Sequence, residues 1–211
     1  MRKLLLTILL MGGFFSLVQA QIFKYKQAPG TVDFGPRIGI TTSIVSIDNN
    51  PFGNPKVRIS LMGGLFARYQ LTNRWSLQTD VVYTQRGARF DKSVTFDSNS
   101  QIERLALGYV DWEFKAIYNV RYKMFGKPGN FDVFLGAQPS FLVNAQLNDL
   151  DVKNNLNSVG FDLIAGSGFT IGRVILYATT KIALTDANKD ISNTEVSIRN
   201  LLTEWTVAYK F

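Results

Sequence analysis

The chain has 211 residues, a formal net charge of +7, no cysteine and no histidine. Without cysteine it can form no disulfide, carry no lipid-modified cysteine and offer no thiol nucleophile. Without histidine it lacks the commonest general base and transition-metal ligand. Its basic residues are spread along the chain without a run of Lys or Arg, which argues against a nucleic-acid-binding groove.

Residues 1–20 read MRKLLLTILLMGGFFSLVQA, with a basic start at Arg2 and Lys3, an apolar stretch after it and a small residue at Ala20. This order is typical of a secretory signal peptide, which we expect to be cleaved after Ala20. The apolar stretch is shorter than the ~20 residues that span a bilayer as a helix. Removing the leader leaves 21 basic and 16 acidic residues, so the mature chain carries about +5. Its length suits a single domain.

Residues 21–32 are expected to form a short periplasmic lead-in, and residues 33–211 one barrel domain. In that domain apolar and polar residues alternate with period two, which is typical of strands that bury one face. The alternation predicts eight strands, at residues 33–45, 58–71, 74–90, 106–122, 131–146, 159–171, 174–184 and 201–211.

The connections between the predicted strands alternate in length. The short ones read TN (72–73), KMFGKPGN (123–130) and GR (172–173), whereas the others are about twelve to fifteen polar residues long. In a closed antiparallel barrel this order places every short turn at one end, as in outer-membrane barrels with short periplasmic turns. The sequence therefore predicts an all-β fold, an eight-stranded antiparallel up-and-down transmembrane β-barrel.

Side-chain volume decides which face of the strands is wet. One face of strand 74–90 carries Trp75, Leu77 and Val81, and one face of strand 106–122 carries Trp112 and Phe114. The interior of an eight-stranded barrel is only wide enough for side chains to fill it. It cannot hold so many large rings, so this face is expected to contact lipid. A soluble lipocalin-like barrel, with the same face inside, is the less favoured alternative.

The opposite face mixes small residues with charges of both signs, which suits a lumen closed by ion pairs, because buried charges persist only when they are paired. The predicted lumen ion-pair network comprises Arg37, Arg68, Asp80, Arg86, Asp111, Glu113, Lys115, Arg121, Asp132, Asp162, Lys181, Glu204 and Lys210.

Aromatic residues gather near the strand ends that adjoin the short turns, where a girdle at the membrane interface is expected. They are Tyr69, Trp75, Tyr122, Phe131, Phe169, Tyr209 and Phe211.

The sequence resembles the PorT-like outer-membrane β-barrel family of small eight-stranded barrels. The resemblance rests on FGPRIGITTS, GGLFARYQLTNRWSLQTDVVYTQRGARF, GFDLIAGSGFTIGRVILYATTKIALTDA and the ending VAYKF. The chain departs from the family at Asp80, where the family usually has Glu, and in YVDWEFKAIY, which lacks the family's proline. The resemblance implies an outer-membrane location, and a founding member acts in protein secretion. The ending also resembles the signal read by the outer-membrane assembly machinery, so Tyr209 and Phe211 are the predicted C-terminal assembly signal.

No enzymatic activity and no cofactor are expected. Outer-membrane acyltransferases, proteases and phospholipases that this chain could be compared with rely on histidine. Asp111 and Glu113 could form an acid/base pair, but Lys115 and Arg121 lie on the same strand face and favour a structural ion-pair network.

Asp186, Asn188 and Asp190 stand at alternate positions of a polar loop and are a weak candidate for Ca²⁺ binding. The loop lacks the glycine and the glutamate that an EF-hand loop requires, which favours a solvated turn. A calcium bridge from this loop to lipopolysaccharide is the alternative.

The segments at the short-turn end contain bases and no acid. This predicted periplasmic basic rim comprises Lys24, Lys26, Arg74, Lys123, Lys127 and Arg173. We expect it to contact lipid phosphates or an acidic periplasmic partner, with simple snorkelling anchors as the alternative.

These features together predict an integral outer-membrane barrel with a structural or interaction role, as an accessory to a secretion or surface complex. The expected partners are outer-membrane lipid, lipopolysaccharide, the assembly machinery and a periplasmic or surface protein, and not nucleic acid. Transport or binding of a small solute is the first alternative, and the lipocalin-like periplasmic carrier is the second.

Overall fold

The protein is described from a computed structural model. It describes residues 29–47, 55–97, 100–124, 127–147, 150–151, 153, 156–185 and 198–211. Eight long strands form the barrel: β1 (Val32–Ile47), β3 (Arg58–Gln70), β4 (Trp75–Asp97), β5 (Ser100–Met124), β6 (Lys127–Leu147), β8 (Val159–Ile171), β9 (Val174–Ala183) and β10 (Ile198–Tyr209). The two-residue strands β2 (Pro55–Lys56) and β7 (Leu150–Asp151) pair with β4 and β6.

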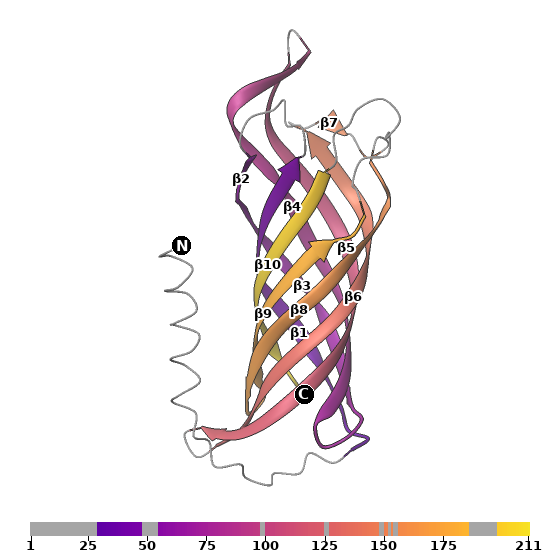
Figure 1. Ribbon diagram of the computed structural model, residues 1–211, viewed down its shortest axis with the longest axis vertical. Coiled ribbons are helices and arrows are strands. Elements are labelled where there is room, and N and C mark those ends of the chain that lie inside the picture. The colour runs from indigo at the N-terminus through magenta and orange to yellow at the C-terminus, as the bar shows by residue number, and fades with distance from the viewer. Residues whose placement is uncertain are drawn as a thin grey trace.

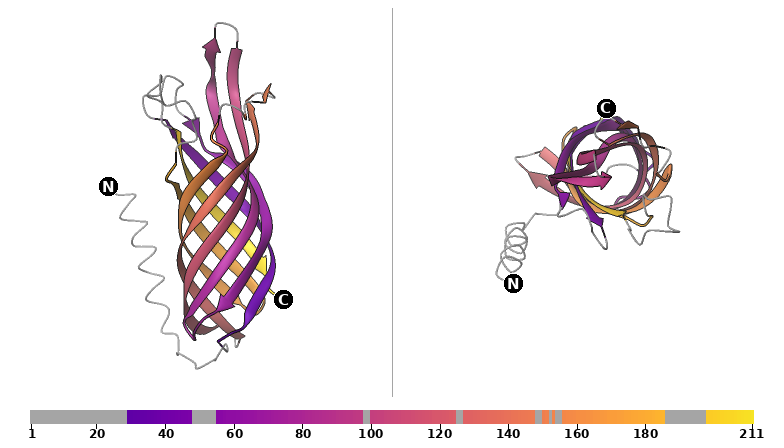
Figure 2. Two further views of the ribbon diagram at one scale, coloured as in Figure 1. Left: turned by 90° about the vertical axis from the view of Figure 1, so that its right-hand side faces the viewer. Right: turned by 90° about the horizontal axis from the view of Figure 1, so that it is seen from above.

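Every long strand pairs antiparallel with its neighbours, and the first strand pairs with the last. Ile40 of β1, for example, lies opposite Trp205 of β10 and Leu61 of β3. The sheet therefore closes on itself, and the view from above shows a ring of strands around one axis (Figure 2). A closed ring satisfies backbone hydrogen-bonding groups within the barrel wall, as a bilayer demands. The predicted eight-stranded antiparallel barrel is confirmed.

Two predicted connections are wrong. The long loop expected at 91–105 is instead a continuation of β4 and β5, in which Val94 pairs with Ile102 and Thr95 with Gln101. This hairpin rises above the other strands (Figure 1). At the other end, the ladder of β5 and β6 continues to the pair Met124 and Lys127, so the turn is tighter than the expected 123–130. Polar residues pair in a ladder as well as apolar ones, so composition alone misplaced both ends.

The short connections lie at one end of the barrel, together with the end of β10 (Figure 1). Gly172 and Arg173 join β8 to β9, and Gly172 has φ 61°, a conformation that glycine adopts without a steric penalty. Between β3 and β4, the hydroxyl oxygen of Thr72 accepts hydrogen bonds from the backbone N–H groups of Arg74 and Trp75, at 3.2 and 3.1 Å. These local bonds hold the tight turns in place.

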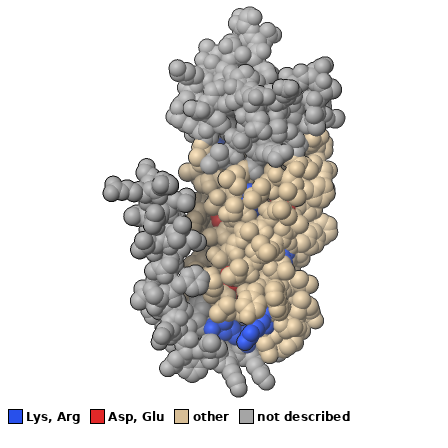
Figure 3. Space-filling model, in the orientation of Figure 1, with Lys and Arg blue, Asp and Glu red and all other residues tan. Residues whose placement is uncertain are grey.

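Apolar side chains face outward and charged side chains face inward. Trp75, Trp112 and Trp205 expose 48%, 46% and 57% of their surface, whereas Arg37 and Glu204 are fully buried. The face shown in Figure 3 is largely uncharged, with a cluster of basic residues toward its lower end. A soluble carrier would need the reverse arrangement, so the lipocalin-like alternative is wrong. No helix among the described residues is long and apolar enough to cross a membrane.

Candidate functional site: a filled ionic lumen

Arg37 of β1 is the centre of the ion pairs inside the barrel. Its Nη1 atom lies 2.9 Å from Asp80 Oδ2 of β4 and 2.7 Å from Glu113 Oε2 of β5. Its Nη2 atom lies 3.3 Å from Glu204 Oε2 of β10, and its Nε–H donates to Thr206 Oγ1 at 3.0 Å. One guanidinium therefore connects four strands across the lumen.

Two lysines extend this central group. Lys115 Nζ of β5 binds Asp80 Oδ2 and Glu113 Oε2. Lys181 Nζ of β9 lies 2.6 Å from Glu113 Oε1 and 2.7 Å from Glu204 Oε1. Each of these carboxylates thus has at least two cationic partners, which offset the cost of removing its charge from water.

A second group lies toward the long-loop end. Arg86 Nη2 of β4 is 2.7 Å from Asp111 Oδ1, and Arg86 Nη1 is 3.0 Å from Asp162 Oδ2. The amide of Gln138 donates to Asp162 Oδ2 at 2.9 Å, and Lys181 Nζ lies 3.8 Å from Asp111 Oδ2. Lys181 therefore links the second group to the central one.

A third group lies toward the short-turn end. Arg68 Nη1 of β3 is 2.9 Å from Asp132 Oδ2, and its Nη2–H donates to the Tyr177 hydroxyl at 2.6 Å. Arg68 Nε–H and the Tyr177 hydroxyl both donate to Gln78 Oε1, at 2.9 Å each. The Gln78 amide in turn donates to Asp80 Oδ1 at 2.8 Å. All three groups are thus parts of one connected network.

The buried charges of the network balance. Among the described residues the buried cations are Arg37, Arg58, Arg68, Arg86, Lys115 and Lys181, and the buried anions are Asp80, Asp111, Glu113, Asp132, Asp162 and Glu204. Arg58 is absent from the predicted set. It lies on the lumen face of β3, and its Nη1–H donates to the backbone oxygen of Arg86 at 3.0 Å. Alternation along RISLMGG places Arg58 on this face, so its position in the alternating pattern could have identified it.

Two predicted network residues lie away from this centre. Lys210 pairs with Asp33 at 3.3 Å near the short-turn end, where both side chains are about one-fifth exposed. Arg121 is only partly buried and stands opposite Asn130 on β6, also toward the short-turn end. Both residues lie on the predicted face of their strands, but their side chains are partly exposed near this end of the barrel.

The lumen also contains apolar clusters that the sequence analysis did not predict. One is formed by Phe66, Ile117, Phe134, Ile164, Ile175, Tyr177 and Ala208. The second, nearer the long loops, is formed by Leu107, Tyr109, Leu142 and Ala145, with Leu156 packed against it. Phe134 fits because its partner across the ladder is Gly166, which leaves space for the ring. The interior therefore combines the ionic network with two apolar clusters, and Tyr177 belongs to both the network and the first cluster.

The basic rim is described in part. Arg74 and Arg173 are exposed in the turns, and they donate hydrogen bonds to the hydroxyls of Tyr118 and Tyr209 at 3.4 and 3.3 Å. The bond to Tyr209 raises the pKa of Arg173. Lys123 and Lys127 lie in β5 and β6, with only their backbone described, and Lys24 and Lys26 lie outside the described residues.

The last residues of the chain are held against β1. Phe211 N–H donates to the backbone oxygen of Phe34 at 3.0 Å. Its ring lies 5.6 Å from that of Phe34 and 5.5 Å from that of Tyr209. These rings add to an aromatic girdle that includes the pair Phe131 and Phe169, 4.9 Å apart.

The calcium candidates Asp186, Asn188 and Asp190 lie outside the described residues. Within the described part of the chain, no group of three or more His, Cys, Asp or Glu residues is arranged to hold a metal ion.

Solved structures of small outer-membrane barrels are similar to this chain. Neisserial surface protein A is 16% identical, with a TM-score of 0.49 over 86% of this chain and 99% of that one. OprG from Pseudomonas aeruginosa is 13% identical, with a TM-score of 0.47 over 88% and 99%. Ail from Yersinia pestis, in complex with the heparin analogue sucrose octasulfate, is 14% identical, with a TM-score of 0.43 over 87% and 100%. No curated protein matches the chain significantly.

The sequence itself matches a family model over most of its length. The model describes the outer membrane protein beta-barrel domain, and the match covers residues 19–188. That span includes the first seven long strands and most residues of the lumen network. The chain is therefore a member of the outer membrane protein beta-barrel domain family.

Proposed function

We propose that this protein is a non-enzymatic outer-membrane barrel with a closed lumen, which acts through the surfaces at its two ends. The observation that carries the proposal is that Arg37 and Lys181 both pair with Glu113 inside the barrel, where all three are fully buried. An ion crossing the barrel would have to separate pairs 2.6 to 2.9 Å long in a region without solvent exposure. Buried pairs of this kind resist disruption because a separated charge loses compensation that no water replaces.

Conductance in a planar bilayer tests this function against small-solute transport. We expect no steady channel from the purified protein, whereas an open porin inserted in the same bilayer conducts. Heat-modifiable migration on detergent gels checks that the barrel is folded. A steady, ohmic conductance that scales with the amount of inserted protein would instead support the transport alternative.

The interaction role is supported by the β4–β5 hairpin, which extends beyond the rest of the barrel at the long-loop end. The PorT-like resemblance suggests an accessory role in a secretion or surface complex.

A photoactivatable amino acid at exposed Val57, beside the start of β3, would capture a surface partner in cells. The same label at lipid-facing Leu135 is the matched control. A protein captured at both positions, or at neither, would contradict a specific surface partner.

The basic rim is proposed to contact phosphates or an acidic periplasmic protein. Its two described arginines stand in turns without a neighbouring acid in the same turn. Replacing all six rim residues with Gln is expected to lower the assembly yield or abolish a crosslinked periplasmic partner. Unchanged yield and crosslinks would leave snorkelling as their only role.

Export and assembly give further proposals. Cleavage after Ala20 predicts a mature chain that begins at Gln21, which N-terminal sequencing checks.

Tyr209 and Phe211 are proposed to be read by the assembly machinery, so Phe211→Ser is expected to accumulate unassembled protein in the periplasm. The matched control is Phe141→Ser, which removes a lipid-facing ring far from the end of β10.

A calcium bridge to lipopolysaccharide through Asp186, Asn188 and Asp190 predicts that a chelator increases proteolysis of the loop that contains these three residues.

A further inference from the structure

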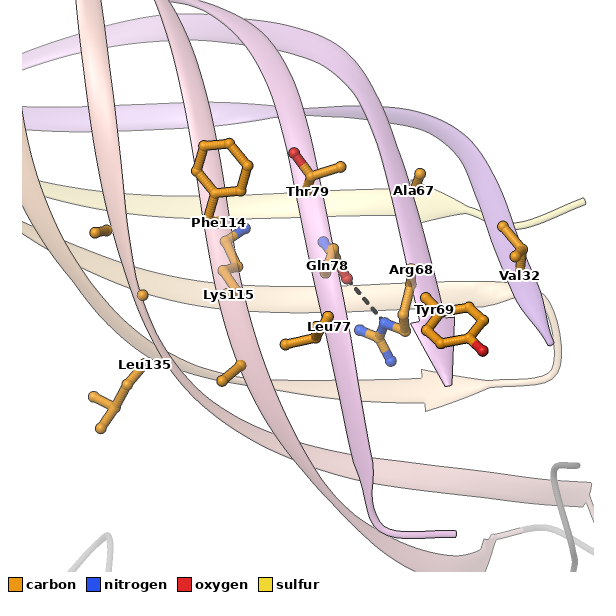
Figure 4. Close-up of a pocket in the computed structure, with 13 residues that line it drawn as sticks. Val32, Ala67, Arg68, Tyr69, Leu77, Gln78, Thr79, Phe114, Lys115 and Leu135 are labelled. Carbon is orange, nitrogen blue, oxygen red and sulfur yellow. Dashed lines mark hydrogen bonds between the residues drawn. The ribbon is translucent and has the colours of Figure 1, made fainter. Parts of the chain in front are cut away.

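The lipid-facing wall has a hollow of about 650 Å³ toward the short-turn end. It is bounded by the outward side chains of Tyr69, Leu77, Phe114 and Leu135, from strands β3 to β6 (Figure 4). The backbone behind it carries Arg68, Gln78 and Lys115, whose side chains belong to the lumen. The surface that a lipid would meet is therefore apolar.

The hollow exists because small and large residues alternate between neighbouring strands. Ala67 lies opposite Thr79, and Ala116 lies between Leu77 and Leu135. The small side chains form the floor, and the large ones that adjoin them form the walls. A groove with walls on both sides contacts more of a narrow apolar chain than a flat sheet does, which increases the dispersion energy.

A cation stands below the groove. Arg74 immediately precedes Trp75 on β4, and its Nη1–H donates to the hydroxyl of Tyr118, the residue opposite Trp75. Thr79 is five positions after Arg74, which corresponds to about 17 Å of extended strand. That length matches about half of the ~30 Å hydrocarbon core of a bilayer. The turn segment 71–74 and the outward residues above it contain no acid, so an anion near Arg74 meets no repulsion from them.

We propose that this groove binds one acyl chain of an anionic phospholipid of the periplasmic leaflet, with the lipid phosphate paired to Arg74. The inference deepens the proposed lipid contact of the basic rim and rests on the orientation that places short turns in the periplasm. Charge complementarity favours this occupant over a second copy of the barrel, because a second copy would bring another Arg74 or more apolar surface to a cationic site.

Native mass spectrometry of the protein released from bilayers tests the proposal. The probes are palmitoyl-oleoyl phosphatidylglycerol and palmitoyl-oleoyl phosphatidylcholine in equal amounts, which share acyl chains and differ in headgroup charge. The wild type is expected to retain one phosphatidylglycerol in preference to phosphatidylcholine. Ala116→Leu fills the groove, and Arg74→Gln removes the cation. Arg74→Gln is expected to lower retained phosphatidylglycerol about fivefold, the effect of one basic residue near a lipid surface. Ala116→Leu is expected to lower retained phosphatidylglycerol as well, because the acyl chain loses its groove.

Matched controls separate this site from general effects. Ala178→Leu enlarges another outward alanine, on β9, and Arg173→Gln removes a rim cation in a different turn. Both controls are expected to retain phosphatidylglycerol as the wild type does. If Ala116→Leu fails to fold, as judged by its migration on detergent gels, Ala67→Leu fills the same groove from β3.

Three results would overturn the proposal. In the first, retention is unchanged by filling the groove. In the second, phosphatidylcholine is retained equally, or Arg74→Gln has no effect. In the third, a dimer appears that Ala116→Leu abolishes, which would assign the groove to a contact between copies. None of these results affects the conductance or crosslinking outcomes, so the proposed function is tested separately.

Discussion

Asp80 and Glu113 lie directly opposite one another on β4 and β5, and both carboxylates are fully buried. Two like charges in this position destabilise a ladder unless cations compensate them. Here Arg37 Nη1 contacts both, at 2.9 and 2.7 Å, and Lys115 Nζ also binds both. The stability of the barrel interior therefore depends on Arg37 of β1 and Lys115 of β5, which compensate this pair of carboxylates.

Replacing Arg37 with Met should destabilise the barrel strongly. The substitution leaves Asp80, Glu113 and Glu204 with one cation fewer in a region closed to water. Removing one partner of a buried pair typically costs about 3–5 kcal/mol. Urea unfolding in detergent micelles, followed by tryptophan fluorescence, measures the change.

Lys210→Gln is the matched control for Arg37→Met, because its pair with Asp33 is partly exposed. Exposed pairs contribute about 0–1 kcal/mol. Equal unfolding midpoints for the two variants would mean that the central network does not stabilise the barrel.

The second group should show coupling between Arg86 and Asp111. Arg86→Gln and Asp111→Asn each leave a buried charge without one of its partners, whereas the double variant removes both charges. We expect the double variant to lose less stability than the sum of the single losses, by about 0.5–3 kcal/mol. The four unfolding free energies of a double-mutant cycle measure this, and strict additivity would contradict a direct pair.

Gly166 should not tolerate a side chain. A Cβ atom at this position would clash with the backbone oxygen of Ala178 and lie 2.6 Å from Phe134 Cζ. Gly166→Ala is therefore expected to cost about 1–3 kcal/mol, as overpacking of a filled core does. Gly63→Ala, whose Cβ would meet no atom closer than 3.8 Å, is the control. Adding Phe134→Leu to Gly166→Ala should recover part of the lost stability. A Gly166→Ala barrel as stable as the Gly63→Ala barrel would mean that the space beside Phe134 is not filled.

The strand faces were predictable because the lipid imposes a simple rule on them. Trp75, Trp112 and Trp205 could not fit inside so narrow a barrel, so their strand face was assigned to the lipid. The opposite face, which carries Arg37 and Glu113, was then assigned to the lumen. The ladder beyond Phe90 was not predictable, because its stability depends on cross-strand pairing and residues 91–105 are mostly polar. The partners of Arg37 could not be predicted either. They depend on the tilt of the strands, which brings residues of β1, β4, β5 and β10 to one height.

The lumen clusters around Phe134 and Tyr109 were missed for a related reason. Period two assigns Phe134 to the lumen face, but the expected lumen held only small and charged residues. Whether a ring fits there depends on the residue across the ladder, which for Phe134 is Gly166. That pairing follows from register, and register is set by the whole closed sheet.

Apolar side chains of the barrel face hydrocarbon, while the ionic side chains neutralise one another inside. The three tryptophans of the chain all lie on the outer face and serve as natural probes. The direct measurement is fluorescence quenching of the barrel in vesicles, by brominated lipid chains and by aqueous acrylamide, with single-tryptophan variants at positions 75, 112 and 205. We predict strong quenching by brominated lipid and weak quenching by acrylamide at every position. Quenching by acrylamide alone, or protection from both quenchers, would mean that these tryptophans do not face lipid.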